Sequence, residues 1–442
     1  MVAAATAVDN GATVIVLEKM AMLGGNTARS EGNMSAMDPE PEKLLPMTRA
    51  VRDIIAKYTN PKPSFRRRFS SSSQSGKKYI FDSPELFALQ TIVGGNCKND
   101  AKLVLTMTRN ATAAMKWLDV QSDMAWFHVP RSWVDVGIGG LYPRGQWPCQ
   151  ADGKTPISTY DAYIRPLAAK VEAAGNPIYK NMKVVSVERD ASGRVTGVKA
   201  LDRKGVERVF SGRSVVLAAG AGLTGMEWIQ IHPHGNPKNG ELESAIAARP
   251  SDTPYVNRDG LRFVDETGRR DEISYGILKQ PGQVAFSIYD QRTIEEKKVE
   301  EKKIESAIAH GYAFKADTLE DLARQAGIDW KNFEKTMKAY NEASVSQNTK
   351  SLPVQKILIG NPVVKAPFYA VPITTTIHHT MGGLRINEKT QILDKNGNVI
   401  PGLYAACEIT GGIHGGNRLG RNALTDLLVF GHIAGQEVAQ KQ

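Results

Sequence analysis

"MVAAATAVDNGATVIVLEK" (residues 1–19) indicates the fold class of this chain. Its alanine-rich start predicts a helix that ends at Gly11, and the β-branched run 13–17 predicts a buried strand that ends at Glu18. Helix, glycine, strand and terminal acid form the second half of a dinucleotide-binding βαβ unit, in which the acid accepts hydrogen bonds from an adenosine ribose. The first strand of such a unit and its G-x-G-x-x-G turn would lie before Met1. The stretch therefore predicts an α/β protein with a Rossmann-like domain.

A glycine-rich segment follows directly. "GGNTARSEGNMSA" (24–36) combines two glycines with small polar residues, which lets the backbone approach a phosphate or a ring closely. A surface turn is the alternative interpretation of the same residues.

Composition and charge narrow the function classes. The 442 residues are enough for a large core and two domains, and 41% hydrophobic with 23% charged residues is ordinary for a soluble globular protein. Cys97, Cys149 and Cys407 share no close spacing, so we expect no disulfide framework, no zinc or iron–sulfur site and no other metal. No apolar run reaches the length of a membrane span, and no signal peptide precedes the first predicted helix.

The net charge of +10 has two interpretations. Basic residues are scattered, apart from "SFRRRFSSSSQSGKK" (64–78), which fits a solvated loop better than a phosphate-binding patch. A small anionic substrate would suit the charge equally well. We therefore expect no nucleic-acid partner.

Further along, the pattern changes twice. Helices are predicted over about 100–130 and over 158–175, a β-hairpin over 183–202 and a short buried strand over 214–222. Segment 233–365 mixes strands with long charged helices such as "DQRTIEEKKVEEKKIESAIAHG" (290–311), which indicates an inserted second domain. Turns, glycines and buried strands return at 366–442, which closes with the helix "ALTDLLVFGHIAGQEVAQ".

Several motifs resemble one family. "PFYAVPITTTIHHTMGGLRIN" (367–387), "VIPGLYAACEITGGIHGGNRLGRNALTDLLVFGHIAG" (399–435), "IQIHP" (229–233) and "YVNRDGLRFVDETGRRDE" (255–272) are similar to soluble fumarate-reductase-type flavoproteins. These are relatives of the flavoprotein subunits of fumarate reductase and succinate dehydrogenase and of L-aspartate oxidase. The resemblance implies an FAD-binding domain of the glutathione-reductase type, residues 1–232 and 366–442, interrupted by an α+β capping domain, residues 233–365. The active site would lie in the cleft between them.

For non-covalent FAD, the resemblance assigns a role to residues from both ends of the chain. Glu18 would bind the adenosine ribose, Val184 would meet the adenine, and Glu408 would bind a ribityl hydroxyl. The remaining expected contacts, to the pyrophosphate and the flavin, are Gly24, Gly25, Asn26, Thr27, Ser30, Gly32, Asn422, Ala423 and Leu424. The last three open a helix, whose positive end suits the charge of a reduced flavin, although Asn422 would also serve as a helix cap.

For the substrate, the resemblance implies a binding site for each of two carboxylates and a proton donor. His378 and Arg418 match the pair that binds one carboxylate, and His232 matches the histidine that binds the opposite one. His379 would face away and pack. Arg270 matches the family's proton donor, whereas Arg269 should point elsewhere; the alternative is that Arg270 only pairs with Asp265, Glu266 or Asp271.

The chain departs from the family after His232. Arg249 matches the relay arginine and Ser244 stands for the substrate-binding threonine, but Ala245 or Ile246 occupies the place of the relay glutamate. Glu243 is a candidate replacement, and the substrate's far end is expected to be less polar than that of fumarate. Segment 222–232 is also shorter than in the family and lacks an FAD-contacting Thr-Gly-Asp-Gly.

The implied function is FAD-dependent reduction of the C=C bond of fumarate or a related enoate, by hydride transfer from flavin N5 and protonation by an arginine. The alternatives are a flavin dehydrogenase or oxidase that works in reverse, and a truncated homologue with impaired FAD binding. The electron donor and the oligomeric state are not indicated. The location is expected to be cytoplasmic for the sequence as it stands, although relatives are often periplasmic.

Overall fold

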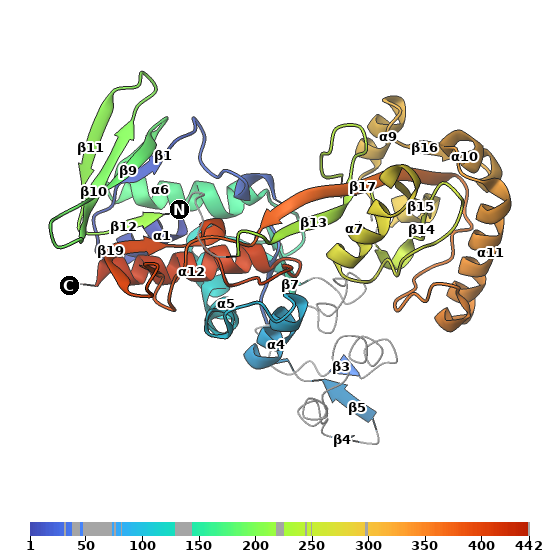
Figure 1. The fold of residues 1–442 in the computed structure, drawn as a ribbon, viewed down its shortest axis with the longest axis horizontal. Coiled ribbons are helices and arrows are strands. Elements are labelled where there is room, and N and C mark those ends of the chain that lie inside the picture. The colour runs from blue at the N-terminus through green and yellow to red at the C-terminus, as the bar shows by residue number, and fades with distance from the viewer. Residues whose placement is uncertain are drawn as a thin grey trace.

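The computed structural model describes residues 1–30, 32–37, 45–46, 73–74, 77–80, 82–128, 144–217, 225–243, 245–248, 250–296 and 299–440. They form two lobes that are joined by strands β13 (Ile229–Gly235) and β17 (Phe368–Thr380), as Figure 1 shows. Among these residues, no helix combines the length and the apolar character that a membrane crossing requires. Most of the basic stretch 64–78 lies outside the described residues.

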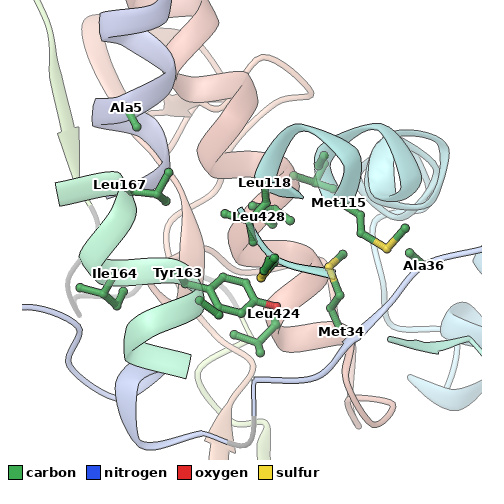
Figure 2. Packing of buried hydrophobic residues seen from close by; sticks show 14 of the residues in the cluster. Ala5, Met34, Ala36, Met115, Leu118, Tyr163, Ile164, Leu167, Leu424 and Leu428 are labelled. Carbon is green, nitrogen blue, oxygen red and sulfur yellow. The ribbon is translucent and has the colours of Figure 1, made fainter. Parts of the chain in front are cut away.

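The first lobe has a helical core. Its helices are α1 (Val2–Asp9), α4 (Pro84–Gly94), α5 (Ala101–Ser122), α6 (Arg165–Ala173), which continues a π-helical turn at Tyr160–Ile164, and α12 (Asn422–Ala439). Side chains at the helix starts accept backbone N–H groups, as Ser83 does for α4 and Asp100 for α5. Figure 2 shows α1, α5, α6 and α12 meeting around a buried cluster that includes Leu118, Leu167 and Leu428.

Parallel strand pairs flank these helices. β1 (Val16–Glu18) pairs with β8 (Ile178–Lys180), and β12 (Val215–Leu217) pairs with β19 (Val399–Ala405), which also carries β18 (Gln391–Leu393). The strand predicted over 13–17 therefore starts later and ends at Glu18. Of the strand predicted over 214–222, residues 218–222 lie outside the described part. Smaller sheets contain β2 (Met34–Ser35), β6 (Ala125–His128) and β7 (Gly145–Cys149), and β3 (Leu45–Pro46), β4 (Ser73–Gln74) and β5 (Lys77–Ile80).

The predicted β-hairpin is confirmed. β9 (Lys183–Arg189) and β10 (Val195–Leu201) pair antiparallel, and β11 (Glu207–Ser211) adds a third strand. The turn forms because the Asp190 carboxylate accepts the backbone N–H groups of Ser192 and Arg194, while the Asp190 N–H donates to the Arg194 carbonyl.

The second lobe is a mixed α+β unit. Its sheet has the order β13-β17-β15-β14, with β14 (Tyr255–Val256), β15 (Ala285–Asp290) and an added β16 (Phe314–Ala316). Its helices are α7 (Arg270–Leu278), α8 (Gln291–Glu295), α9 (Glu301–Ala309), α10 (Leu319–Ala326) and α11 (Trp330–Ser346). The buried residues of its two apolar clusters come from positions 246–373. The boundaries after residues 232 and 365 stay a prediction.

The single charged helix predicted over 290–311 is wrong. α8 ends at Glu295 and α9 begins at Glu301, with Val299 buried in between. The Glu300 N–H donates to the Ala245 carbonyl, 3.1 Å away. Burial of Val299 and this bond to another segment redirect the chain, which an uninterrupted helix could not do.

Candidate active site

Strand β13 presents polar side chains at alternate positions. Gln230, His232 and His234 lie two residues apart and all three are buried, although the pairing of β13 with β17 is irregular at both steps. The His232 ring centroid lies 4.9 Å from that of His234 and 4.9 Å from that of His378 on β17. The two connecting strands therefore gather a row of imidazoles.

Gln230 holds His378 and Arg418 together. Its amide N–H2 donates to Asn417 Oδ1 at 3.1 Å and to the Arg418 carbonyl, which turns its oxygen towards His378 Nδ1, 2.8 Å away. An amide oxygen only accepts, so this contact requires a proton on Nδ1. Arg418 NH2, which can only donate, lies 3.1 Å from the same nitrogen and requires a lone pair there, so the two contacts select different tautomers of the neutral ring. The structure thus brings together the predicted carboxylate-binding pair.

His378 is neutral in the ligand-free site. Burial lowers its pKa to about 2, and the positive charges of Arg418 and Arg270 add to the effect. With the proton on Nδ1, Nε2 has a free lone pair. In that tautomer His378 can donate from Nε2 to a carboxylate only after it takes up a second proton, whereas the tautomer with the proton on Nε2 donates as a neutral ring.

His232 is a neutral donor of defined tautomer. Burial, followed by the charge of Arg270, lowers its pKa well below the usual range. Its Nδ1 accepts the backbone N–H of His234 at 3.2 Å. The proton of the neutral ring is therefore on Nε2, from which it can be donated to a substrate oxygen.

Arg270 comes from the second lobe. It is the first residue of α7, a place where the helix dipole disfavours a cation, so its position needs a reason other than helix stability. Its positive charge lowers the pKa of both His232 and His378, so the guanidinium acts on these rings electrostatically. Glu266 and Asp271, two of the acids considered as alternative partners, form ion pairs with Arg262 and Arg269.

Arg269 points elsewhere, as expected from the sequence. Its guanidinium bonds to Asp271 and, across the lobes, to Asn96 Oδ1. Asn96 lies in the turn between α4 and α5 and has a positive φ of 61°. Arg269 therefore links the second lobe to the first beside Arg270.

The expected proton relay is described only in part. Ser244 and Arg249 lie outside the described residues. Ile246, which with Ala245 was predicted as the residue in the place of the family glutamate, is buried in an apolar cluster. Glu243, its candidate replacement, accepts a hydrogen bond from Asn236 Nδ2 at 3.3 Å.

The residues predicted for FAD fit that cofactor in two places. Gly24 and Gly25 have φ of 109° and 48°, and a Cβ on Gly25 would meet open space, so the backbone here is free to face a pyrophosphate. Asn26 Nδ2 donates to Glu408 Oε2 at 3.4 Å, which joins two predicted contacts that lie 382 positions apart. The nearby Thr27 carbonyl accepts the Ser30 hydroxyl.

The adenosine end has an acid beside uncovered apolar surface. Glu18 ends β1, and its carbonyl accepts the Met182 N–H, which brings β1 against the start of β9. Met20 is 56% exposed and Val184 is 38% exposed. Glu18 can accept hydrogen bonds from ribose hydroxyls, and the exposed apolar side chains beside it can contact an adenine ring. The surface therefore suits an adenosine.

The remaining predicted contacts also have structural partners. The Gly32 carbonyl accepts the Tyr163 hydroxyl at 2.8 Å, and Asn422 Nδ2 donates to Thr91 Oγ1 at 3.1 Å. Leu424 packs in the core of the first lobe, and Ala423 lies between them on the first turn of α12. The 18-residue α12 begins at Asn422, so its N-terminal backbone amides lie at the predicted flavin contacts.

His379 belongs to a second buried group that the sequence interpretation missed. Its ring centroid lies 5.3 Å from that of His414, and its Nε2 lies 3.9 Å from Glu408 Oε1. His414 Nε2 is in turn 3.1 Å from Asp426 Oδ2. Burial raises the pKa of Asp426. The group of His379, His414 and Asp426 thus adjoins Glu408, one of the residues predicted to bind FAD.

Gln230, His234 and Tyr255 were also missed. Gln230 and His234 could have been found from their alternation with His232 in "IQIHPHG". Tyr255 gives no such signal, because its hydroxyl meets His234 only through the fold.

Comparison with known proteins shows the family of this chain. The FAD binding domain family matches residues 69–223 and 211–424. The chain is 30% identical to NADH:acrylate oxidoreductase from Vibrio harveyi, over 98% of this chain and 48% of that protein. It is 29% identical to fumarate reductase (cytochrome) from Shewanella frigidimarina, over 99% and 75%. The chain thus spans about half the length of the first of these relatives.

A solved structure supports the same fold. The open conformation of a flavocytochrome c3 fumarate reductase superposes with a TM-score of 0.69 at 26% identity, covering 99% of this chain and 76% of that one. The α/β fold predicted from the sequence is confirmed by this similarity.

Proposed function

The chain belongs to the FAD binding domain family, and we propose that it reduces the C=C bond of an α,β-unsaturated carboxylate. One observation supports this most strongly: Arg418 lies within hydrogen-bond distance of His378, the His378 ring lies beside that of His232, and the charge of Arg270 from the second lobe acts on both histidines. Cations and N–H donors gathered in one place suit the binding of an anion.

Arg418 and His378 are suited to bind the substrate carboxylate. The guanidinium of Arg418 is buried and presents a planar fork that matches a carboxylate. His378 would take up a proton as the anion enters and then donate from Nε2. Positive charge at this end stabilises the enolate character that develops during reduction.

His232 would bind the far end of the substrate, and Arg270 would act at the α-carbon, next to the bound carboxylate. His232 donates its Nε2–H to a substrate oxygen. A guanidinium N–H of Arg270 delivers the proton to the α-carbon. An arginine is a poor acid, with an unperturbed pKa above about 12, but the acceptor is a strongly basic carbanion-like carbon. We propose Arg249 as the residue from which Arg270 regains its proton.

FAD, when bound, supplies the hydride, and the protein supplies binding and orientation. Glu18, Gly25, Asn26 and Glu408 are the residues that we propose to hold it, without a covalent bond. The two lobes then enclose the substrate and exclude water from the reacting carbons.

The test is enoate-dependent oxidation of a reduced dye. Protein supplemented with FAD is given reduced methyl viologen under anaerobic conditions, with fumarate, acrylate or urocanate as the acceptor. We expect dye oxidation with at least one enoate and formation of the corresponding saturated acid, identified by mass spectrometry. If only the reverse reaction occurs, or if the protein never acquires a flavin spectrum, the proposal is wrong.

A further inference from the structure

His234 forms a hydrogen-bonded unit that the proposed function does not use. Only 7% of the residue is exposed, and its Nε2 lies 2.6 Å from the hydroxyl of the fully buried Tyr255. Its ring neighbours His232, and the charge of Arg270 acts on it. The three histidine rings therefore follow in the order His234, His232, His378. His234 lies at the end of this row that is away from Arg418.

The proton of His234 can be placed. Among the described residues, His234 Nε2 is the one hydrogen-bond partner of the Tyr255 hydroxyl. We assign the phenol as the donor to Nε2, since the residues that the structure describes offer its proton no other acceptor. Burial keeps both groups neutral, raising the pKa of Tyr255 and lowering that of His234 to about 3. The neutral ring then carries its proton on Nδ1.

The Nδ1–H group of His234 is a hydrogen-bond donor that is available to a ligand. It is fully buried, and within the described part of the chain it has no hydrogen-bond partner. An unpaired buried donor is costly, so such a group beside a binding site indicates that a ligand supplies the acceptor. Ile246, one of the two residues predicted to occupy the place of the family glutamate, is packed in an apolar cluster.

We propose that His234 is a specificity-determining residue whose Nδ1–H binds an acceptor oxygen at the far end of the substrate. The inference rests on the proposed function and refines it. Arg418 and His378 hold the carboxylate next to the double bond, and His234 selects enoates with a second oxygen group. That group can be a carboxylate or a neutral ester carbonyl. A simple alkenoate has no partner for this donor.

Binding of saturated analogues tests the proposal independently of turnover. Isothermal titration calorimetry compares succinate and monomethyl succinate, which have a far oxygen, with butyrate, which has none. His234→Gln keeps a group that can reach Tyr255 but loses the donor at the Nδ1 position, whereas His234→Asn retains an N–H there. His310→Phe, which changes an exposed histidine of the second lobe, is the matched control.

We expect His234→Gln to weaken the binding of succinate and monomethyl succinate by about 10- to 100-fold and to leave butyrate unchanged. His234→Asn and His310→Phe should bind all three as the wild type does. Succinate against its monoester distinguishes an anionic from a neutral acceptor. Equal loss for butyrate, or no loss for the other two, would overturn the proposal. If the binding pattern appears but no enoate is reduced, the proposed function fails and the role of His234 stands.

Discussion

At the scale of single residues, Arg418 is expected to supply most of the carboxylate binding. Arg418→Ala should raise KM steeply, since it leaves a buried substrate charge without its partner, at a cost of about 2–5 kcal/mol. The exposed Arg385 provides the matched control, and Arg385→Ala should have a wild-type KM. Steady-state kinetics with the best enoate measures both. An unchanged KM in Arg418→Ala would remove this residue from the site.

His378 predicts a pH dependence of binding. Its pKa is lowered to about 2 in the free protein, so it is neutral at ordinary pH. A bound carboxylate raises this pKa, because the opposite charge favours the protonated ring. Between the two pKa values binding takes up a proton, and the affinity therefore falls as pH rises, by up to tenfold per unit.

Calorimetry of succinate binding checks this prediction. The dissociation constant should increase from pH 6 to pH 8, and the observed heat should vary with the ionisation enthalpy of the buffer. In His378→Gln both dependences should disappear. A dissociation constant that does not change with pH in the wild type would show that His378 binds the carboxylate as a neutral ring.

What the sequence could predict of the site depended on the kind of signal. His232, His378, Arg418 and Arg270 lie in motifs long enough to be recognised. The structure brings the first three together, and the charge of Arg270 acts on both histidines. The supporting groups depend on contacts between distant segments. The donor assignment of His234, for example, requires a tyrosine from another strand.

At the scale of secondary structure elements, the packing of α1 on α12 is the most sensitive contact. A Cβ on Gly435 would lie 2.5 Å from the Ala3 carbonyl oxygen and 2.5 Å from Thr6 Cβ. Gly435→Ala should therefore lower the free energy of unfolding by about 1–3 kcal/mol, as overpacking does. Chemical denaturation measures it, with the neighbouring exposed Gln436→Ala as the control. Equal stability of the two variants would show that the helices can separate at no cost.

Elements were predicted well where local chemistry decides them. The 183–202 hairpin was recognised because alternating apolar residues flank a turn that Asp190 closes. The break in the charged segment 290–311 was not recognised. Burial of Val299 and the hydrogen bond from Glu300 to Ala245 are tertiary effects, and they interrupt a sequence pattern that favours a helix.

At the scale of the whole molecule, the link between Arg269 and Asn96 should help to fix the second lobe over the first. Arg269→Gln should raise KM and increase the radius of gyration in solution, while FAD binding stays unchanged. Small-angle X-ray scattering and kinetics provide the two readouts. Arg258→Gln changes an exposed arginine of the same lobe and serves as the control. Identical scattering and kinetics in Arg269→Gln and the wild type would contradict this role.

The central claim is that an arginine from the second lobe completes a site built on the first. Arg270 belongs to α7, whereas the carboxylate-binding Arg418 lies just before α12. Without Arg270, substrate can still bind, but the α-carbon has no proton donor. Loss of a positioned proton donor slows a reaction by about 10²- to 10⁴-fold.

Anaerobic stopped-flow spectroscopy of the pre-reduced protein tests this claim most directly. Mixed with the best enoate, the wild type should regain the absorbance of oxidised flavin at a rate that saturates with enoate concentration. Arg270→Ala should remain reduced with the same enoate and be reoxidised normally by oxygen. Reoxidation of Arg270→Ala by the enoate at the wild-type rate would contradict the account.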